Sequence, residues 1–263
     1  MWNDDQFANE SQFDVEFADE LFLRSPFPQI SEEDRASASG PPRGLSALDF
    51  LRREIADFEA YSIFPNTLRI PQNPTNDERL HSDGSNFASV FRALARNRAG
   101  EQSRVDIIDS VRAVIPRLQD INVQLIGGFL TPVFKIQESD NNLHEFNVSQ
   151  MSDGTLRILG LLTALYHPNR PQVVSLEEPE QTVNPGILLV LADAIKTVVG
   201  KSQIIVTTHS PSLIDHFDVS EIYSVSLSDT GTVVHQVRGH QLDAVRRGLF
   251  SVGELMIMEG LGN

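Results

Sequence analysis

The sequence contains no cysteine, no long apolar segment and no excess of basic residues. Without cysteine the chain can form neither a disulfide nor a cysteine–metal site, and this composition fits a reducing compartment. The longest apolar run, residues 158–166, is too short to cross a bilayer and is interrupted by Thr163. The first residues are acidic and show no signal-peptide pattern. We therefore expect a cytoplasmic protein that does not associate with a membrane.

Basic residues are scarce: 21 lysines and arginines face 36 acidic residues, which gives a net charge of −15. Residues 1–40 contain ten acidic and two basic residues, a net charge of −8, so the remainder carries −7. This balance excludes a basic surface over the whole chain of the kind that binds nucleic acid. The 263 residues are 40% hydrophobic, which is enough for one large domain or for one domain with an inserted lobe.

The N-terminal half combines a short β pattern with helical patterns. Residues 11–24 alternate apolar and polar side chains and predict a β-hairpin. Residues 31–43 are rich in serine, glycine and proline, which is typical of a flexible loop. Apolar residues then recur at helical spacing over residues 45–61, and further helices are predicted near 86–98 and 103–115.

The C-terminal half begins with a β region at 122–149 and then alternates between helix and strand. This alternation predicts an α/β fold in which helices cover a parallel sheet. The expected elements are a helix at 155–166, a strand at 173–176, a helix at 185–199, a strand at 204–207, strands at 221–227 and 232–237, and a helix at 242–248.

A first motif, Met151-Ser152-Asp153-Gly154-Thr155, immediately precedes a predicted helix. Small residues at a helix start expose backbone N–H groups and the positive end of the helix dipole, which together favour a phosphate. Ser152 or Asp153 is also typical of an ordinary N-cap that binds nothing.

A second motif, residues 173–180 (VVSLEEPE), is an apolar strand that ends in adjacent acids. In open α/β sheets, ligands bind at the carboxyl ends of such strands. The carboxylate of Glu177 is a suitable ligand for Mg²⁺, and the carboxylate of Glu178 is suited to polarise a water for attack on a phosphoryl group. The alternative is a solvated acidic turn without a catalytic role.

A third motif, residues 204–211 (IIVTTHSP), is another apolar strand, and His209 lies at its end. An imidazole at this edge can contact a γ-phosphate. A single histidine in this position is also compatible with a purely structural role.

Taken in this order, the motifs resemble the C-terminal part of the RecF/SMC-like ABC-type ATPases, a group that includes AAA-type ATPases with an EEPE sequence. The resemblance extends over residues 45–263. Residues 152–157 (SDGTLR) resemble the ABC signature, residues 173–180 resemble Walker B, and residues 207–211 (TTHSP) resemble the switch-histidine loop. The resemblance implies a P-loop NTPase fold with a parallel core sheet, additional antiparallel strands and an inserted helical lobe.

The resemblance also implies roles for individual residues and the cofactors ATP and Mg²⁺. Glu177 would bind Mg²⁺, Glu178 would be the general base, Glu180 would lie in the D-loop, and His209 would sense the γ-phosphate. The signature that contacts nucleotide would consist of Ser152, Asp153, Gly154 and Thr155.

The phosphate-binding loop of such enzymes, G-x-x-x-x-G-K-[ST], does not occur in the sequence. Gly200-Lys201-Ser202 is the nearest approach, but Ile195 stands where the first glycine is required, and the triplet follows a predicted helix. Because the family places this loop near its N-terminus, we expect the chain to begin after the first strand, the P-loop and the first helix.

The resemblance therefore implies a division into four parts. They are a remnant of the N-terminal β lobe at 1–30, a flexible loop at 31–44, a helical lobe at 45–120, and the C-terminal ATPase subdomain at 121–263.

Two classes of function remain open at this point. The chain could complete an ATPase site with a P-loop that lies elsewhere, either in a head-to-tail dimer or on a P-loop-bearing partner. Alternatively, it could be a non-hydrolysing interaction or regulatory module on the same fold. DNA or a nuclease as a further partner follows from the family resemblance alone.

Overall fold

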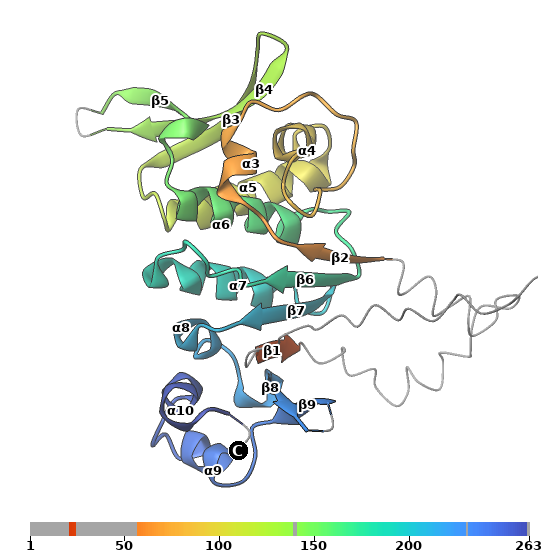
Figure 1. Cartoon of the computed structure of the whole chain (residues 1–263). Coiled ribbons are helices and arrows are strands. Elements are labelled where there is room, and N and C mark those ends of the chain that lie inside the picture. The colour runs from red at the N-terminus through yellow and green to blue at the C-terminus, as the bar shows by residue number, and fades with distance from the viewer. Residues whose placement is uncertain (1–20, 25–56, 139–140, 230, 262–263) are drawn as a thin grey trace, which may run out of the picture.

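The computed structural model describes residues 21–24, 57–138, 141–229 and 231–261 (Figure 1). The strands are β1 (Leu21–Arg24), β2 (Phe58–Tyr61), β3 (Leu118–Ile126), β4 (Phe129–Gln137), β5 (Leu143–Asn147), β6 (Val173–Glu177), β7 (Gln203–Thr208), β8 (Ile222–Ser228) and β9 (Gly231–Gln236). The helices are α3 (Pro65–Arg69), α4 (Phe87–Leu94), α5 (Arg98–Arg112), α6 (Asp153–Tyr166), α7 (Leu188–Val198), α8 (Pro211–Ile214), α9 (Gly239–Arg246) and α10 (Val252–Glu259). Three short 3-10 helices are η1 (Val148–Gln150), η2 (Pro185–Ile187) and η3 (Val219–Glu221).

The main sheet has six strands in the order β2-β6-β7-β1-β8-β9. Strands β2, β6 and β7 run parallel, whereas β1 pairs antiparallel with both β7 and β8. The prediction that the strands at 173–176 and 204–207 are parallel neighbours is confirmed. The mixed α/β fold, with a parallel core and additional antiparallel strands, is confirmed as well.

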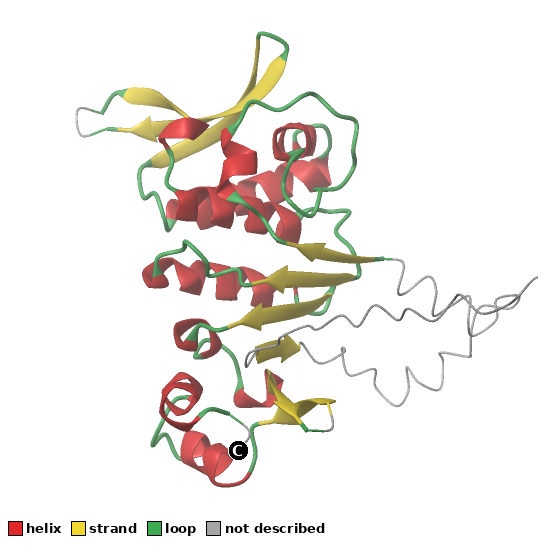
Figure 2. Ribbon diagram, in the orientation of Figure 1, coloured by secondary structure: helices red, strands yellow, loops and turns green. Residues whose placement is uncertain are grey.

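A second sheet contains the antiparallel strands β3, β4 and β5 and accounts for the β region expected at 122–149. Figure 2 shows this sheet at one end of the molecule, separated from the main sheet by a layer of helices.

The N-terminal half differs from the sequence prediction at one strand. Of the helix expected over 45–61, only residues 57–61 are described, and Phe58–Tyr61 form β2. Their backbone pairs in parallel with buried β6, and the Tyr61 side chain is only 2% exposed. Pairing with a distant strand thus outweighs the local helical spacing. Of the hairpin expected over 11–24, only Leu21–Arg24 lie among the described residues, and they form β1.

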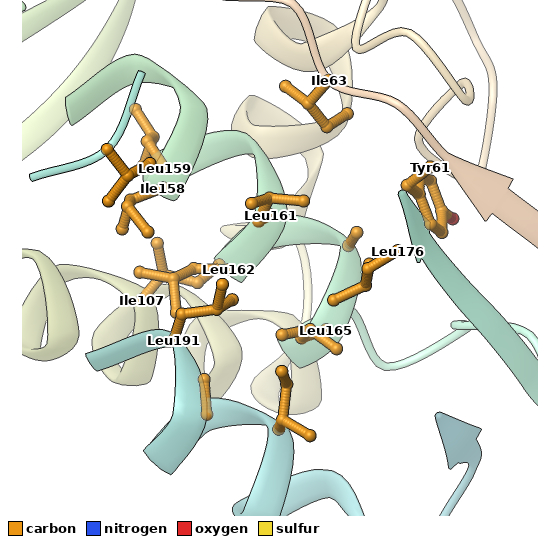
Figure 3. Close-up of a cluster of buried hydrophobic side chains, with 14 of the residues drawn as sticks. Tyr61, Ile63, Ile107, Ile158, Leu159, Leu161, Leu162, Leu165, Leu176 and Leu191 are labelled. Atoms are coloured by element: carbon orange, nitrogen blue, oxygen red, sulfur yellow. The ribbon is translucent and has the colours of Figure 1, made fainter. Parts of the chain in front are cut away.

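Helix α6 lies at the centre of the hydrophobic core (Figure 3). All residues from 154 to 165 are buried, so the helix is enclosed on every side, and it packs against α3, α5 and α7. A Cβ atom on Gly160 would lie 2.6 Å from Ile63 Cγ2, which shows how closely the chain before α3 approaches the helix. Neither α6 nor any other helix in the described ranges is long and apolar enough to span a membrane.

The C-terminal end of α6 carries a buried titratable group, the imidazole of His167. Its Nδ1 atom accepts a hydrogen bond from the backbone N–H of Asn169 at 3.2 Å. Burial lowers the pKa of His167 to about 4, and the positive charges of Arg79 and Arg170 act in the same direction. In the folded protein, therefore, the imidazole is neutral at neutral pH.

We predict that His167 makes the stability of the protein depend on pH. Its pKa is about 6.5 in the unfolded chain and about 4 in the folded one, so protonation favours the unfolded state. The contribution of the neutral imidazole to the free energy of unfolding is therefore complete above about pH 6.5 and is lost as the pH falls toward 4. Between about pH 7 and pH 5 this loss should amount to about 2 kcal/mol of unfolding free energy. Urea unfolding of wild type and His167→Gln at both pH values measures it. Wild type should lose more stability than the variant, and equal losses would show that His167 is not buried in its neutral form.

Candidate functional site

The site lies where the parallel strands β6 and β7 end side by side. Glu177 is paired with Thr207, and the backbone N–H of Glu178 donates to the carbonyl oxygen of Thr207 at 3.0 Å. Strand β7 continues to Thr208, so His209 follows it directly. The second and third motifs therefore meet at the C-terminal edge of one sheet, as predicted, which is where open α/β sheets bind ligands.

The side chains of Glu178 and His209 face each other at this edge. The Oε1 atom of Glu178 lies 3.6 Å from the Nε2 atom of His209. The Glu178 side chain is mostly buried, whereas the His209 side chain is 46% exposed. The pair thus combines a sheltered carboxylate with an imidazole that a ligand can reach from solvent. A carboxylate and an imidazole side by side are of the types used in general acid–base chemistry.

The backbone of Glu178 has an unusual conformation, with a φ angle of +41°. A non-glycine residue adopts this region only when surrounding contacts hold it there. Here the main contact is Arg157, whose Nη2 atom donates to the Glu178 carbonyl oxygen at 2.9 Å and to that of Glu177 at 3.4 Å. The turn that carries the carboxylate is therefore fixed from α6.

Arg157 ends the signature-like stretch at residues 152–157, but the sequence alone gave it no role at the site. It is 2% exposed, and a buried guanidinium is unfavourable unless hydrogen bonds and opposite charges surround it. Burial lowers the pKa of Arg157, whereas the carboxylates of Glu180 and Glu178 raise it. An arginine within an otherwise apolar helix was a signal for such a role.

The side chain of Glu180 is directed toward the end of β7. Its Oε1 atom accepts hydrogen bonds from Thr208 Oγ1 at 2.5 Å and from the backbone N–H of His209 at 3.1 Å. The structure thus joins Glu180 to the same strand end as His209, and Thr208 is a second residue that the sequence interpretation did not single out.

Glu177 presents an exposed carboxylate at the end of β6. Among the residues that the structure describes, no group of three or more acidic, histidine or cysteine side chains is arranged to hold a metal ion. A single carboxylate nevertheless fits Mg²⁺, because this ion commonly binds one or two protein carboxylates together with water and substrate phosphates.

The first motif forms the N-terminus of α6, and Ser152 is the N-cap. Its Oγ atom accepts from the backbone N–H of Thr155 at 3.2 Å and also lies 2.8 Å from Thr155 Oγ1. Asp153 forms an ion pair with Arg69 at 2.5 Å, and Arg69 Nη2 also donates to the Met151 carbonyl oxygen at 3.2 Å. Ser152 thus has the geometry of an N-cap. Arg69 is a further contact that the sequence did not reveal.

Gly154, in the first motif, allows the start of α6 to pack closely against the loop that follows the second motif. A Cβ atom at this position would lie 2.9 Å from the carbonyl oxygen of Thr182, so a larger residue would collide with the loop that follows Glu180. The first turn of α6 consequently packs against that loop, whereas His209 contacts Glu178 through its side chain and Glu180 through its backbone N–H.

Comparison with known proteins gives several partial structural similarities. An SMC head domain with a coiled coil and joint from Pyrococcus yayanosii is 16% identical, with a TM-score of 0.42 over 57% of this chain and 29% of that chain. An SMC head bound to the C-winged helix domain of ScpA is 13% identical, with a TM-score of 0.47 over 71% of this chain and 57% of that chain. The SMC head domain from Thermotoga maritima is 12% identical, with a TM-score of 0.38 over 59% of this chain and 56% of that chain.

The chain thus spans 29% of the first of these structures and little more than half of the other two. No curated protein matches the sequence. Residues 6–215, which are most of the chain, match a protein family described as "AAA domain, putative AbiEii toxin, Type IV TA system". The chain therefore belongs to this AAA domain family.

Proposed function

We propose that this chain supplies the signature, Walker B and switch-histidine parts of a composite ATPase site of the RecF/SMC-like ABC type. A P-loop from another segment or polypeptide would hold the ATP. The observation that carries the proposal is the Glu178–His209 pair, with Oε1 and Nε2 3.6 Å apart at the shared end of two parallel strands. A carboxylate and an imidazole in this position suit the activation of water and the contact with a terminal phosphate.

Each residue of the pair has a distinct role in this proposal. Glu178 orients the attacking water and takes its proton, because its carboxylate is sheltered and its backbone is held by Arg157. His209 contacts the γ-phosphate with its exposed imidazole. Glu177 provides one carboxylate to Mg²⁺, which neutralises phosphate charge when it is bound.

The start of α6 has a separate role. Helix N-termini bind phosphate through free N–H groups and the helix dipole, and Ser152, Asp153, Gly154 and Thr155 occupy this turn. The described hydrogen bonds of Ser152 involve Thr155, and none joins it to Glu178 or His209. We propose that this turn meets a γ-phosphate held across a head-to-tail dimer or by a P-loop-bearing partner.

The alternative is a non-hydrolysing interaction module. The absence of the G-x-x-x-x-G-K-[ST] pattern from the sequence favours it, because this loop normally surrounds the β- and γ-phosphates. A composite site predicts that Glu178→Gln and Ser152→Arg behave differently in ATP, whereas an interaction module predicts no such difference.

The chain alone should hydrolyse ATP negligibly. Phosphoryl transfer depends almost entirely on positioning and charge stabilisation, so losing the phosphate loop should abolish turnover even with Glu178 intact. Phosphate release from purified wild type and Glu178→Gln should be equally low. Turnover in wild type that disappears in Glu178→Gln would show that another loop of this chain holds the phosphates.

Adding a strand–P-loop–helix segment by fusion should produce Mg²⁺-dependent hydrolysis. Glu178→Gln should then lower kcat by about 100-fold or more, because the amide keeps the size of the side chain but removes the base. It should accumulate as an ATP-bound dimer, whereas Ser152→Arg should remain monomeric in ATP, since bulk and positive charge fill the turn that must meet the partner's nucleotide. Size-exclusion chromatography with and without ATP distinguishes the two.

Asn97→Arg is the matched control for Ser152→Arg. It removes the N-cap of another helix, α5, and adds the same side chain near His167, at the opposite end of α6 from Ser152. This control should dimerise like its parent. Identical elution of Glu178→Gln and Ser152→Arg in ATP would refute the composite site and favour the interaction module.

A further inference from the structure

We propose that Glu180 is a positioning residue that ties the end of β7 to the loop after β6 and thereby holds His209 opposite Glu178. The family resemblance places Glu180 in the D-loop without this role. The function assigned to the Glu178–His209 pair rests on the proposed ATPase site, but the positioning itself rests on contacts within this chain.

One carboxylate oxygen of Glu180 organises the last residue of β7 and the two residues that follow it. Glu180 Oε1 accepts from Thr208 Oγ1 at 2.5 Å and from the His209 backbone N–H at 3.1 Å. Thr208 Oγ1 in turn accepts from the backbone N–H of Ser210 at 2.9 Å. The Thr208 side chain is fully buried, so this arrangement is sheltered from competing water. Hydrogen bonds to an ionised acceptor are also stronger than neutral ones.

The hydrogen bonds of Glu180 lie just beyond the last backbone pairing between β6 and β7. The paired positions of β6 and β7 end at Glu177 and Thr207, and the last backbone bond joins the Glu178 N–H to the Thr207 oxygen. Beyond this point the sheet no longer fixes the two chains relative to each other. Glu180 restores the connection two residues after Glu178 and at the backbone of His209 itself.

The loop that carries Glu180 needs such external contacts. Glu178 and Thr182, on either side of it, have φ angles of +41° and +63°, which are unfavourable for residues with side chains. Within the loop, the Gln181 N–H donates to the Glu178 oxygen at 3.1 Å, and the Val183 N–H donates to the Glu180 oxygen at 2.9 Å. These bonds close the turn locally but do not connect it to β7.

Arg157 offsets the cost of placing a carboxylate here. The Oε2 atom of Glu180 is buried and has no hydrogen-bond partner among the described residues, while Oε1 is shared by two donors. The buried guanidinium of Arg157 interacts favourably with this charge and also fixes the Glu178 carbonyl. Arg157 therefore offsets part of the cost of burying the Glu180 side chain at this position.

The test is amide hydrogen exchange, followed by NMR on the full chain without nucleotide. Glu180→Ala removes the acceptor and should accelerate exchange of the His209 amide by about tenfold or more. Exchange at core positions such as Val174 and Val206 should be unchanged. Glu180→Gln retains an oxygen at the same place and should exchange like wild type. Asp193→Asn, an exposed acid-to-amide change on α7, is the matched control.

Two results would overturn the proposal. Unchanged His209 exchange in Glu180→Ala would show that the carboxylate does not hold this strand end. Faster exchange throughout β6 and β7 would show that Glu180 supports the scaffold in general. If Glu180→Ala does not fold, Glu180→Asp replaces it, because the shorter side chain keeps the charge but should not reach the His209 amide.

The same variants in the P-loop fusion separate this proposal from the proposed function. Glu180→Ala should lower kcat with little change in KM, and Glu180→Gln should restore it. If the wild-type fusion does not hydrolyse ATP at all, the ATPase proposal fails. The exchange measurement still decides whether Glu180 positions His209.

Discussion

The parallel pairing of β6 with β7 is the interaction on which the site depends. Parallel strands end at the same edge of a sheet, and the register that sets Glu177 opposite Thr207 brings Glu178 and His209, just beyond the strand ends, within 3.6 Å of each other. A shift of one residue in this register would move one strand end along the other by about 3.3 Å and would separate the Glu178 carboxylate from the His209 imidazole. The placement of the two side chains is thus specified by backbone hydrogen bonds formed well inside the sheet.

Helix α6 provides the second half of this arrangement. Its apolar residues are buried against α3, α5 and α7, which fixes the position of the helix independently of the site. Arg157 then extends from this rigid element to the turn after β6. Burying a guanidinium costs free energy, and the two carbonyl oxygens and the nearby carboxylates offset that cost. The strained Glu178 backbone is accordingly supported by the core itself.

The parts of this structure that were predictable from sequence are those with a local signal. Apolar runs that end in EEPE and THSP marked β6 and β7, and a largely apolar stretch after SDGT marked α6. Strand β2 was missed because its pairing with β6 involves residues more than a hundred positions away. The contacts of Arg157, Arg69 and Thr208 were missed for the same reason, since each depends on which loop the fold places beside it.

The close packing of Gly154 against Thr182 has a mechanical consequence. A helix is stiff over a single turn, and Gly154 and Arg157 lie three residues apart on α6. A displacement of the start of α6 therefore moves the helix as a rigid unit. Gly154 passes this displacement to the Thr182 carbonyl, and Arg157 passes it to the Glu178 carbonyl. Both of those residues have positive φ angles and little freedom to adjust. Contact at the helix start and the conformation of the acidic turn are consequently linked without any intervening flexible segment.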